Sequence, residues 1–410
     1  MKSPLSRRGF LGTTAGGAFG MSLLSSRGAA ASASFDAIPL KEPMSLWDLP
    51  TPALVIDAEA MESNLNKMAD FYRGKKAKLR PHTKTHKCPL LAKKQLALGA
   101  VGVCAAKVSE AEVMVEAGVE NVLITSPVVT REKIDRVLAL AKQSPGVSIV
   151  VDQERNVRDF DDAARAAGVK LSVLIDLNVG TDRTGIAMGK PALDLAEAIR
   201  KSSFLSFQGL QAYAGHLMHL RGFDYRRQAS EATMGRAVEF KHALERAGFE
   251  VPVLTGGGTG TYNIDSEIDG ITDVQVGSYL FMDVNYRNVG GKDGPVYEDF
   301  RPSLLVLATA ISQPAKGRIT IDAGYKAFAT DQEPPDPLSL PGVSYRWGGD
   351  EHGILEFRDP RGPGEVKLGD KVLLIASHCD PTVNLYDHYY PFRNERVEEM
   401  WPISARGHSQ

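Results

Sequence analysis

Residues 147–177, VSIVVDQERNVRDFDDAARAAGVKLSVLIDL, contain one full repeat of the pattern by which the rest of the chain can be interpreted. Two apolar runs rich in β-branched residues, 147–152 and 170–177, flank a segment at 156–167 whose apolar residues recur at helical spacing. Gly168 follows this segment where a helix is expected to end, because glycine readily adopts the left-handed cap conformation. Strand, helix and strand in this order predict parallel strands, since a helical crossover must return the chain.

The same alternation extends in both directions along the sequence. A strand at 51–57 and a helix at 58–72 come first, and further helices lie between most of the later strands. Eight of these later strands are expected, at 78–84, 101–107, 121–126, 147–152, 170–177, 209–215, 251–257 and 273–281. Eight strands alternating with helices predict an α/β fold, a (β/α)8 TIM-like barrel, rather than an open sheet.

The pattern changes at about residue 300, where helices are expected to stop. Short strands at 304–311, 318–322, 354–357 and 371–376 are separated by loops rich in Pro, Gly and Asp. We therefore predict a barrel over residues 45–300 and a C-terminal all-β domain over residues 301–405.

The amino-acid composition indicates a globular protein and argues against several other classes. The chain is 43% hydrophobic and 24% charged, which is ordinary for a globular protein with a large core. Its 48 Lys and Arg nearly balance 50 Asp and Glu, so no overall basic field favours nucleic acid as a partner. Cys88, Cys104 and Cys379 lie far apart, which argues against a disulfide framework or a cysteine zinc site. No apolar run is long enough to predict a membrane span in the mature protein.

The first 33 residues have the features of an export signal. SRRGFLG at 6–12 is followed by a Gly/Ala-rich apolar stretch at 13–24 and by small residues at 29–33. This order predicts a twin-arginine signal peptide, cleaved after Ala31 or Ala33, and hence the twin-arginine translocase as a partner and a periplasmic location. The alternative is a disordered tail that happens to contain two arginines.

Reactive side chains are expected where barrel strands end, because catalysis in this fold takes place at the C-terminal ends of the strands. The first barrel strand ends in RPHTKTHK at 80–87, whose Lys84 could form a Schiff base, although a solvated surface lysine is the alternative. The seventh strand runs into GGGTGT at 256–261 and the eighth into GSY at 277–279. Backbone N–H groups and hydroxyls there could hold a phosphate. A lysine facing phosphate donors forms a joint signal that neither part gives alone.

A second group of candidates lies in HCDPTVN at 378–384, after the strand at 371–376. An extended backbone would turn His378 and Asp380 to one side and Cys379 to the other. An imidazole and a carboxylate together suit a divalent metal ion. The alternative is a capping aspartate and a satisfied histidine near a turn.

With these motifs, residues 45–400 resemble the D-threonine aldolase and D-serine dehydratase group. These are fold type III pyridoxal-phosphate enzymes that share the alanine racemase-type barrel and a C-terminal β domain. The motifs that carry the resemblance are 80–87, 256–261, 277–279 and 378–384. The resemblance implies pyridoxal 5'-phosphate as cofactor, a homodimer, and a first strand at 53–57 that belongs to the β domain.

The resemblance also implies roles for individual residues. Lys84 would carry the Schiff base, and Arg183 and Tyr213 would lie at the cofactor ring. His378 and Asp380 would bind the metal; an aspartate at the second position is typical of the aldolases, with manganese or magnesium, whereas the dehydratases have cysteine and zinc there. The residues implied at the cofactor phosphate are Gly258, Thr259, Gly277, Ser278 and Tyr279.

The implied reaction is cleavage of a D-3-hydroxy amino acid, such as D-threonine, to glycine and an aldehyde. The metal would hold the 3-hydroxyl, and His219 would remove its proton, with His216 as the alternative base. A D-serine or D-threo-3-hydroxyaspartate dehydratase remains the main alternative, followed by an amino-acid racemase and a non-catalytic pyridoxal-phosphate carrier. The segment 213–216 departs from the aldolase pattern after the tyrosine, which leaves the preferred substrate open.

Overall fold

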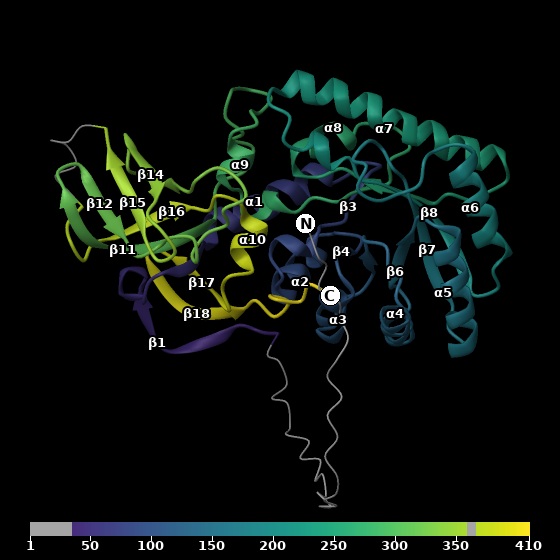
Figure 1. Ribbon diagram of the computed structural model, residues 1–410, viewed down its shortest axis with the longest axis horizontal. Helices are drawn as coiled ribbons and strands as arrows, with labels where there is room; N and C mark the ends of the chain where they lie inside the picture. Colours follow the sequence, from purple (N-terminus) through teal and green to yellow (C-terminus); the bar gives the residue numbers. More distant parts are fainter. Residues whose placement is uncertain (1–34, 359–365) are drawn as a thin grey trace, which may run out of the picture. The chain divides into compact units, whose positions relative to one another are not determined.

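Two separate β-sheets organise the chain (Figure 1). The computed structural model describes residues 35–358 and 366–410, so the predicted export signal at 1–33 lies outside the described residues. One sheet has eight strands, all paired in parallel, and the other has ten strands, paired antiparallel except for β17 with β2. A parallel barrel with a β domain confirms the predicted fold class.

The barrel sheet runs in the order β3-β10-β9-β8-β7-β6-β5-β4. It closes between its two end strands through one isolated bridge, His82 with Cys104, in which the Cys104 N–H donates to the Pro81 carbonyl at 2.8 Å. The strands are β3 (Lys78–Leu79), β4 (Val103–Ala105), β5 (Val122–Ile124), β6 (Ser148–Val151), β7 (Leu171–Asp176), β8 (Leu205–Ala212), β9 (Val253–Gly256) and β10 (Asp273–Val274).

Helices surround this sheet (Figure 1). In α5 (Glu154–Ala167) the predicted stripe, including Val157 and Phe160, is buried, and Gly168 ends the helix with φ 65°. Complete burial of a side chain such as Phe160 contributes about 1.5–3 kcal/mol to stability. The others are α1 (Ala58–Tyr72), α2 (Pro89–Ala97), α3 (Val108–Glu116), α4 (Arg131–Gln143), α6 (Lys190–Lys201), α7 (Phe223–Arg246) and α8 (Tyr262–Asp265).

Both ends of the described chain contribute strands to the β domain. β2 (Ala53–Asp57) pairs with β11 (Leu304–Ala315) and, in parallel, with β17 (His388–Arg393), so the chain passes through this sheet before it enters the barrel. The remaining strands are β1 (Ile38–Ser45), β12 (Arg318–Ile321), β13 (Asp336–Pro337), β14 (Val343–Trp347), β15 (Gly353–Phe357), β16 (Lys371–Ile375) and β18 (Arg396–Pro402).

The barrel strands all end earlier than predicted, and the two largest differences, at β3 and β10, lie beside the site. β3 stops at Leu79 because Pro81 has no N–H to donate to a ladder, and Thr83–Thr85 then form the 3-10 helix η2. β10 stops at Val274, and the residues predicted to continue it form the 3-10 helix η5 (Ser278–Leu280). The predicted strand residues from Lys78 to Lys84 are therefore only partly strand.

The expectation that helices stop at about residue 300 is wrong at one place. The segment Cys379–Val383 forms a short helix, α10. Pro381 fits its first turn, where a missing N–H costs little, and the Asp283 carboxylate accepts the Cys379 N–H at 2.9 Å. α10 contacts η2, so this helix brings the tail of the β domain against the barrel rim.

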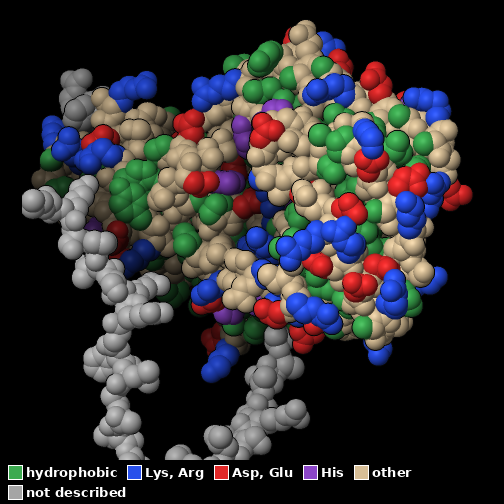
Figure 2. Space-filling model, turned by 45° about the vertical axis from the view of Figure 1, so that its right-hand side comes forward, with side chains coloured by type: hydrophobic (Ala, Val, Ile, Leu, Met, Phe, Trp, Pro, Cys, Tyr) green, Lys and Arg blue, Asp and Glu red, His purple; other side chains and the backbone are tan. Residues whose placement is uncertain are grey.

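Charged side chains of both signs are interspersed over the face of the molecule in Figure 2, without a large region of one sign. This distribution matches the formal net charge of −2. Among the residues that the structure describes, no helix has the length and apolar character needed to cross a membrane.

Candidate active site

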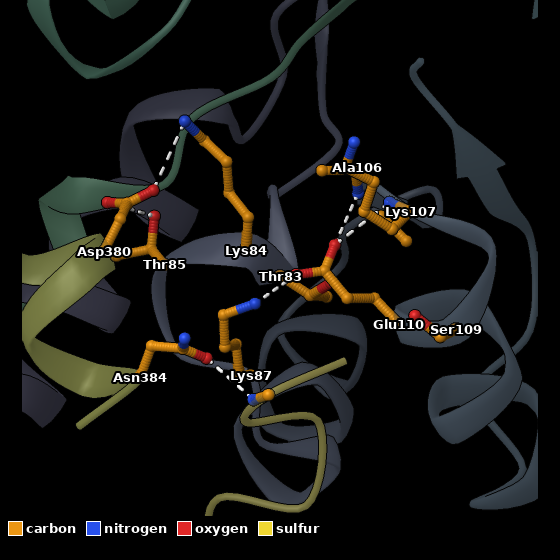
Figure 3. Close-up of polar contacts among 12 residues, drawn as sticks. Thr83, Lys84, Thr85, Lys87, Ala106, Lys107, Ser109, Glu110, Asp380 and Asn384 are labelled. Atoms are coloured by element: carbon orange, nitrogen blue, oxygen red, sulfur yellow. Dashed lines mark hydrogen bonds and ion pairs between the residues drawn. The ribbon is translucent and has the colours of Figure 1, made fainter. Parts of the chain in front are cut away.

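Lys84 lies in η2, at the rim where the barrel closes. The His82 Nδ1 accepts the Lys84 backbone N–H at 3.3 Å, and the Thr83 hydroxyl donates to the Cys104 carbonyl at 2.8 Å. These two bonds fix the turn on both sides of the lysine. The Lys84 Nζ then reaches across to the β domain, where it lies 3.2 Å from the Asp380 Oδ1 (Figure 3).

The ion pair with Asp380 sets the charge of this lysine. The Asp380 carboxylate is the main cause that raises the pKa of Lys84 above its usual range, although 43% of the Lys84 side chain is accessible. Burial alone would raise the pKa of Asp380, but Lys84 and His378 hold it below its usual value. Both groups are charged, so Lys84 must lose its proton before it can act as a nucleophile.

His378 and Asp380 lie together at the start of α10. The His378 Nε2 is 3.8 Å from the Asp380 Oδ2, whereas Cys379 is buried with its Sγ 3.4 Å from the Met282 carbonyl oxygen. The expected extended backbone through Asp380 is wrong, since His378 is the N-cap and Asp380 is helical. The cap geometry nevertheless brings the two side chains to one side.

These donors fit an open divalent metal site. Asp380 Oδ1 has an ion pair with Lys84 but no hydrogen-bonded partner among the described residues, and the His378 Nδ1 lies 2.8 Å from the Asp331 Oδ2. A carboxylate behind a histidine is the usual support of a metal-binding imidazole. Within 35–358 and 366–410 no group of three or more His, Cys, Asp or Glu is arranged for a metal. Water or substrate would therefore complete the coordination, as in magnesium and manganese sites.

The glycine-containing turns at 256–261 and 277–279 contact each other and lie beside the Lys84 segment. A β-carbon at Gly277 would lie 2.4 Å from the Thr85 hydroxyl, so only glycine lets η5 pack this closely on η2. In the described chain the backbone N–H groups of Gly258 and Ser278 donate to no protein acceptor. Free N–H groups on neighbouring turns suit a phosphate, and these residues therefore fit the phosphate of pyridoxal 5'-phosphate.

The predicted use of the Tyr279 hydroxyl at the phosphate is not supported. Tyr279 is fully buried, and its hydroxyl accepts a hydrogen bond from the Gln95 Nε2 at 3.0 Å. The Gln95 Oε1 in turn lies 3.3 Å from the His86 Nε2. Burial lowers the pKa of His86 to about 4, and its Nδ1 accepts the Cys88 N–H, so a neutral His86 donates to Gln95. The tyrosine thus links the phosphate turn to the Lys84 segment, and its backbone N–H donates to the Thr259 hydroxyl oxygen at 3.0 Å.

Arg183 and Tyr213 border a cavity of about 590 Å³ that also contacts Lys84. The Arg183 guanidinium lies 5.4 Å from the centre of the Tyr213 ring. The glycine turns are outside the cavity lining, so the cavity corresponds to the ring side of the site. Gln211 and Asp176, which sequence reasoning missed, bond to each other at 2.9 Å within the barrel. Polar residues inside predicted barrel strands are the signal that could have revealed them.

The structure places the two candidate bases differently. The His219 ring packs against Tyr286 with centroids 4.5 Å apart. Partial burial, followed by the charges of His378 and Lys84, lowers the pKa of His219 to about 4, although part of the residue is solvent-accessible. His216 instead lies against Gly180, in the loop after β7. His219 thus lies within electrostatic range of Lys84, and its role as the base stays a prediction.

A buried carboxylate lies behind the glycine run and makes stability depend on pH. Asp265 accepts hydrogen bonds from the hydroxyls of Ser230 and Thr261, and burial raises its pKa to about 6. The folded chain therefore holds this proton more tightly than the unfolded chain. The free energy of unfolding should fall as pH rises from the ordinary carboxyl range through about 6, by about 3 kcal/mol in all.

We expect Asp265→Asn to remove this part of the pH dependence, because the amide does not titrate. Urea unfolding at about pH 4.5 and about pH 7.5 should show the variant gaining about 2 kcal/mol relative to the unsubstituted chain at the higher pH. Asp269→Asn, at an exposed aspartate, serves as the control. A variant-minus-parent difference that is the same at both pH values would contradict the expectation.

Comparison with known proteins supplies independent findings. The family model described as the alanine racemase N-terminal domain matches residues 56–285, and the model described as a putative serine dehydratase domain matches residues 303–392. A 3-hydroxy-D-aspartate aldolase of Paracoccus denitrificans (strain Pd 1222) is 35% identical over 373 residues, which are 90% of this chain and 95% of that protein.

Two further relatives extend the comparison. The crystal structure of D-threonine aldolase from Filomicrobium marinum is 39% identical and superimposes with a TM-score of 0.85, covering 91% of this chain and 100% of that one. A D-threo-3-hydroxyaspartate dehydratase of Delftia sp. (strain HT23) is 26% identical over 377 residues, which are 87% of this chain and 98% of that protein. Relatives with both reactions therefore share nearly the whole architecture.

Proposed function

The chain belongs to the alanine racemase-type family that includes D-threonine and 3-hydroxy-D-aspartate aldolases, and from this membership we propose a metal-assisted, pyridoxal-phosphate-dependent aldolase for D-3-hydroxy amino acids. The products would be glycine and an aldehyde. One observation carries the proposal: the amine of Lys84 lies 3.2 Å from the carboxylate of Asp380, which adjoins His378. A carbonyl cofactor tethered to Lys84 and a metal ion at His378 and Asp380 would therefore both contact the same substrate molecule.

Each residue has a separate task in this proposal. Lys84 supplies the amine that tethers the cofactor, and the N–H groups of Gly258 and Ser278 hold its phosphate. Pyridoxal phosphate, when bound, supplies an electron sink for negative charge at the α-carbon of an amino acid. Arg183 lies at the ring side, where a cation tunes the electronics of the cofactor.

The hydroxyl end of the substrate would be handled by the other residues. His378 and Asp380 would hold a divalent cation, manganese or magnesium rather than zinc, whose charge favours loss of a hydroxyl proton. We propose that His219 accepts this proton, because it lies within electrostatic range of Lys84 and His378 and its imidazole is neutral near pH 7. Asp331 would keep the His378 ring oriented through its Nδ1.

The dehydratase remains the second candidate because one relative of that kind spans nearly the whole chain. The resemblance placed cysteine and zinc in the dehydratases where the aldolases have aspartate. Cys379, the thiol that follows His378, is buried against the Met282 carbonyl oxygen. Burial also raises the pKa of this thiol, which disfavours the thiolate that would bind zinc. These observations favour the aldolase.

Incubation with D-threonine tests the proposal directly. We expect glycine and acetaldehyde in equal amounts, because breaking the bond between the α- and β-carbons is the step that the site would assist. Chromatography of the amino acid and a coupled reductase assay for the aldehyde measure the two products. Formation of 2-oxobutanoate and ammonia would instead establish the dehydratase.

Removal of the metal is the control for the same experiment. After chelation we expect turnover to fall, and manganese or magnesium should restore it. Full activity in a chelated, metal-free sample would contradict the metal-assisted part of the proposal and leave the cofactor part intact.

We also propose that the chain is exported to the periplasm by the twin-arginine route and acts as a homodimer. The support is the sequence SRRGFLG at 6–12 and the family resemblance. Cell fractionation and the mature N-terminus, expected just after Ala31 or Ala33, test export, and light scattering tests the dimer. A cytoplasmic, uncleaved chain would refute the first proposal.

A further inference from the structure

Arg226 is a buried cation without a carboxylate partner. Its side chain lies on α7 and is 0% exposed. No carboxylate oxygen of the described residues lies within ion-pair distance of it, although buried charges are normally paired. The Phe223 and Tyr297 rings lie 5.9 Å from its Cζ, which leaves the guanidinium enclosed by aromatic side chains and backbone.

Every hydrogen bond that the structure gives to this guanidinium ends on a backbone carbonyl. The Nε donates to the Gly260 oxygen at 2.7 Å, and the Nη2 donates to the Gly290 oxygen at 2.8 Å. The Nη1 donates to the oxygens of Leu220 at 2.7 Å and Val289 at 3.1 Å. A planar guanidinium that bonds four carbonyls holds their segments in fixed positions.

Two of these segments carry site residues. Gly260 lies in η4 (Thr259–Thr261), within the glycine run proposed to hold the phosphate, and Leu220 follows the proposed base, His219. The glycine run is held a second time by Tyr297, whose hydroxyl donates to the Thr259 carbonyl at 2.7 Å. Arg226 is thus a common anchor for the phosphate turn and for the His219 segment.

We propose that Arg226 is a positioning residue for the cofactor phosphate, which fixes the glycine run and supplies a permanent positive charge behind it. The inference rests on the proposed function, because it takes the phosphate to be that of pyridoxal phosphate. A buried cation whose hydrogen bonds reach only neutral carbonyls keeps its charge available to a bound dianion. The Asp299 carboxylate acts on this guanidinium at longer range but does not form an ion pair with it.

The test compares the affinity for pyridoxal 5'-phosphate with that for pyridoxal, which has the aldehyde but no phosphate. Absorbance titrations use the full chain and the variants Arg226→Lys and Arg226→Met. We expect Arg226→Met to weaken binding of the phosphorylated aldehyde by on the order of 10- to 100-fold, while binding of pyridoxal changes by less than about threefold. Arg226→Lys keeps the charge and should lie between the parent and Arg226→Met.

Arg227→Met is the matched control, since Arg227 lies next on the same helix but is exposed and paired with Asp224. It should bind both aldehydes as the parent does. Equal losses for both aldehydes in Arg226→Met, or none, would overturn the inference; if that variant does not fold, Arg226→Lys decides by the same ratio. Failure of the unsubstituted chain to bind pyridoxal 5'-phosphate would instead refute the proposed function.

Discussion

Lys84→Arg is expected to abolish covalent capture of pyridoxal phosphate and to lower cleavage of D-threonine by about 10³-fold or more. The guanidinium stays protonated and cannot attack an aldehyde. It does preserve the positive charge opposite Asp380, which is 15% exposed at its side chain and would otherwise be left without its counterion. The variant therefore separates nucleophilicity from charge.

Lys107→Arg provides the matched control, because Lys107 lines the same cavity but is exposed. Borohydride reduction of the cofactor-loaded chain, followed by peptide mass mapping, should label Lys84 in the parent and in Lys107→Arg. A label on a different lysine, or unchanged turnover in Lys84→Arg, would show that the amine was assigned to the wrong residue.

Asp380→Asn is expected to have an effect of similar size but of a different kind. The neutral amide is a poor metal ligand, so activity that depends on manganese should fall by about 10²- to 10³-fold. Asp380 is also the main cause of the raised pKa of Lys84, so its loss should lower that pKa and leave cofactor capture intact or faster. Asp380→Asn should therefore slow cleavage while it leaves cofactor capture intact or makes it faster.

Manganese titration followed by electron paramagnetic resonance measures the predicted loss of manganese affinity in Asp380→Asn. Asp331→Asn is the graded control: it leaves both proposed ligands in place but removes the carboxylate behind His378. It should weaken manganese binding by about 10- to 100-fold. Manganese affinity in Asp380→Asn equal to that of the parent would exclude Asp380 as a ligand.

The existence of the barrel strands could be predicted, but their ends could not. Apolar runs and Gly168 locate β6, α5 and β7 because these are local signals. The end of β3 depends on Pro81, which sequence alone also marks. The turn that follows depends on the His82 cap and on Cys104 in the adjacent strand β4. The bond from Thr83 to Cys104 joins residues 21 positions apart, and such contacts leave no periodic pattern in the sequence.

The site shows the same division between local and distant signals. Lys84, His378 and Asp380 stand in compact motifs and could be named from sequence. Asp331 and Arg226 could not, because their importance comes only from the segments that they contact. The Tyr279 hydroxyl was assigned to the phosphate because its motif is local, whereas its partner Gln95 lies on a different helix.

The barrel strands differ in how many hydrogen bonds join them, so parts of the barrel should differ in how readily they open locally. β7 and β8 share a ladder over six residues each. The segments that contain β3 and β4 share one bridge and two backbone hydrogen bonds, from Val101 to Leu79 and from Cys104 to Pro81. Amide deuterium exchange should accordingly be slowest along the β7–β8 wall and fastest at this seam. Local opening of this seam would loosen the turn that holds Lys84 while the β7–β8 side of the barrel stays closed.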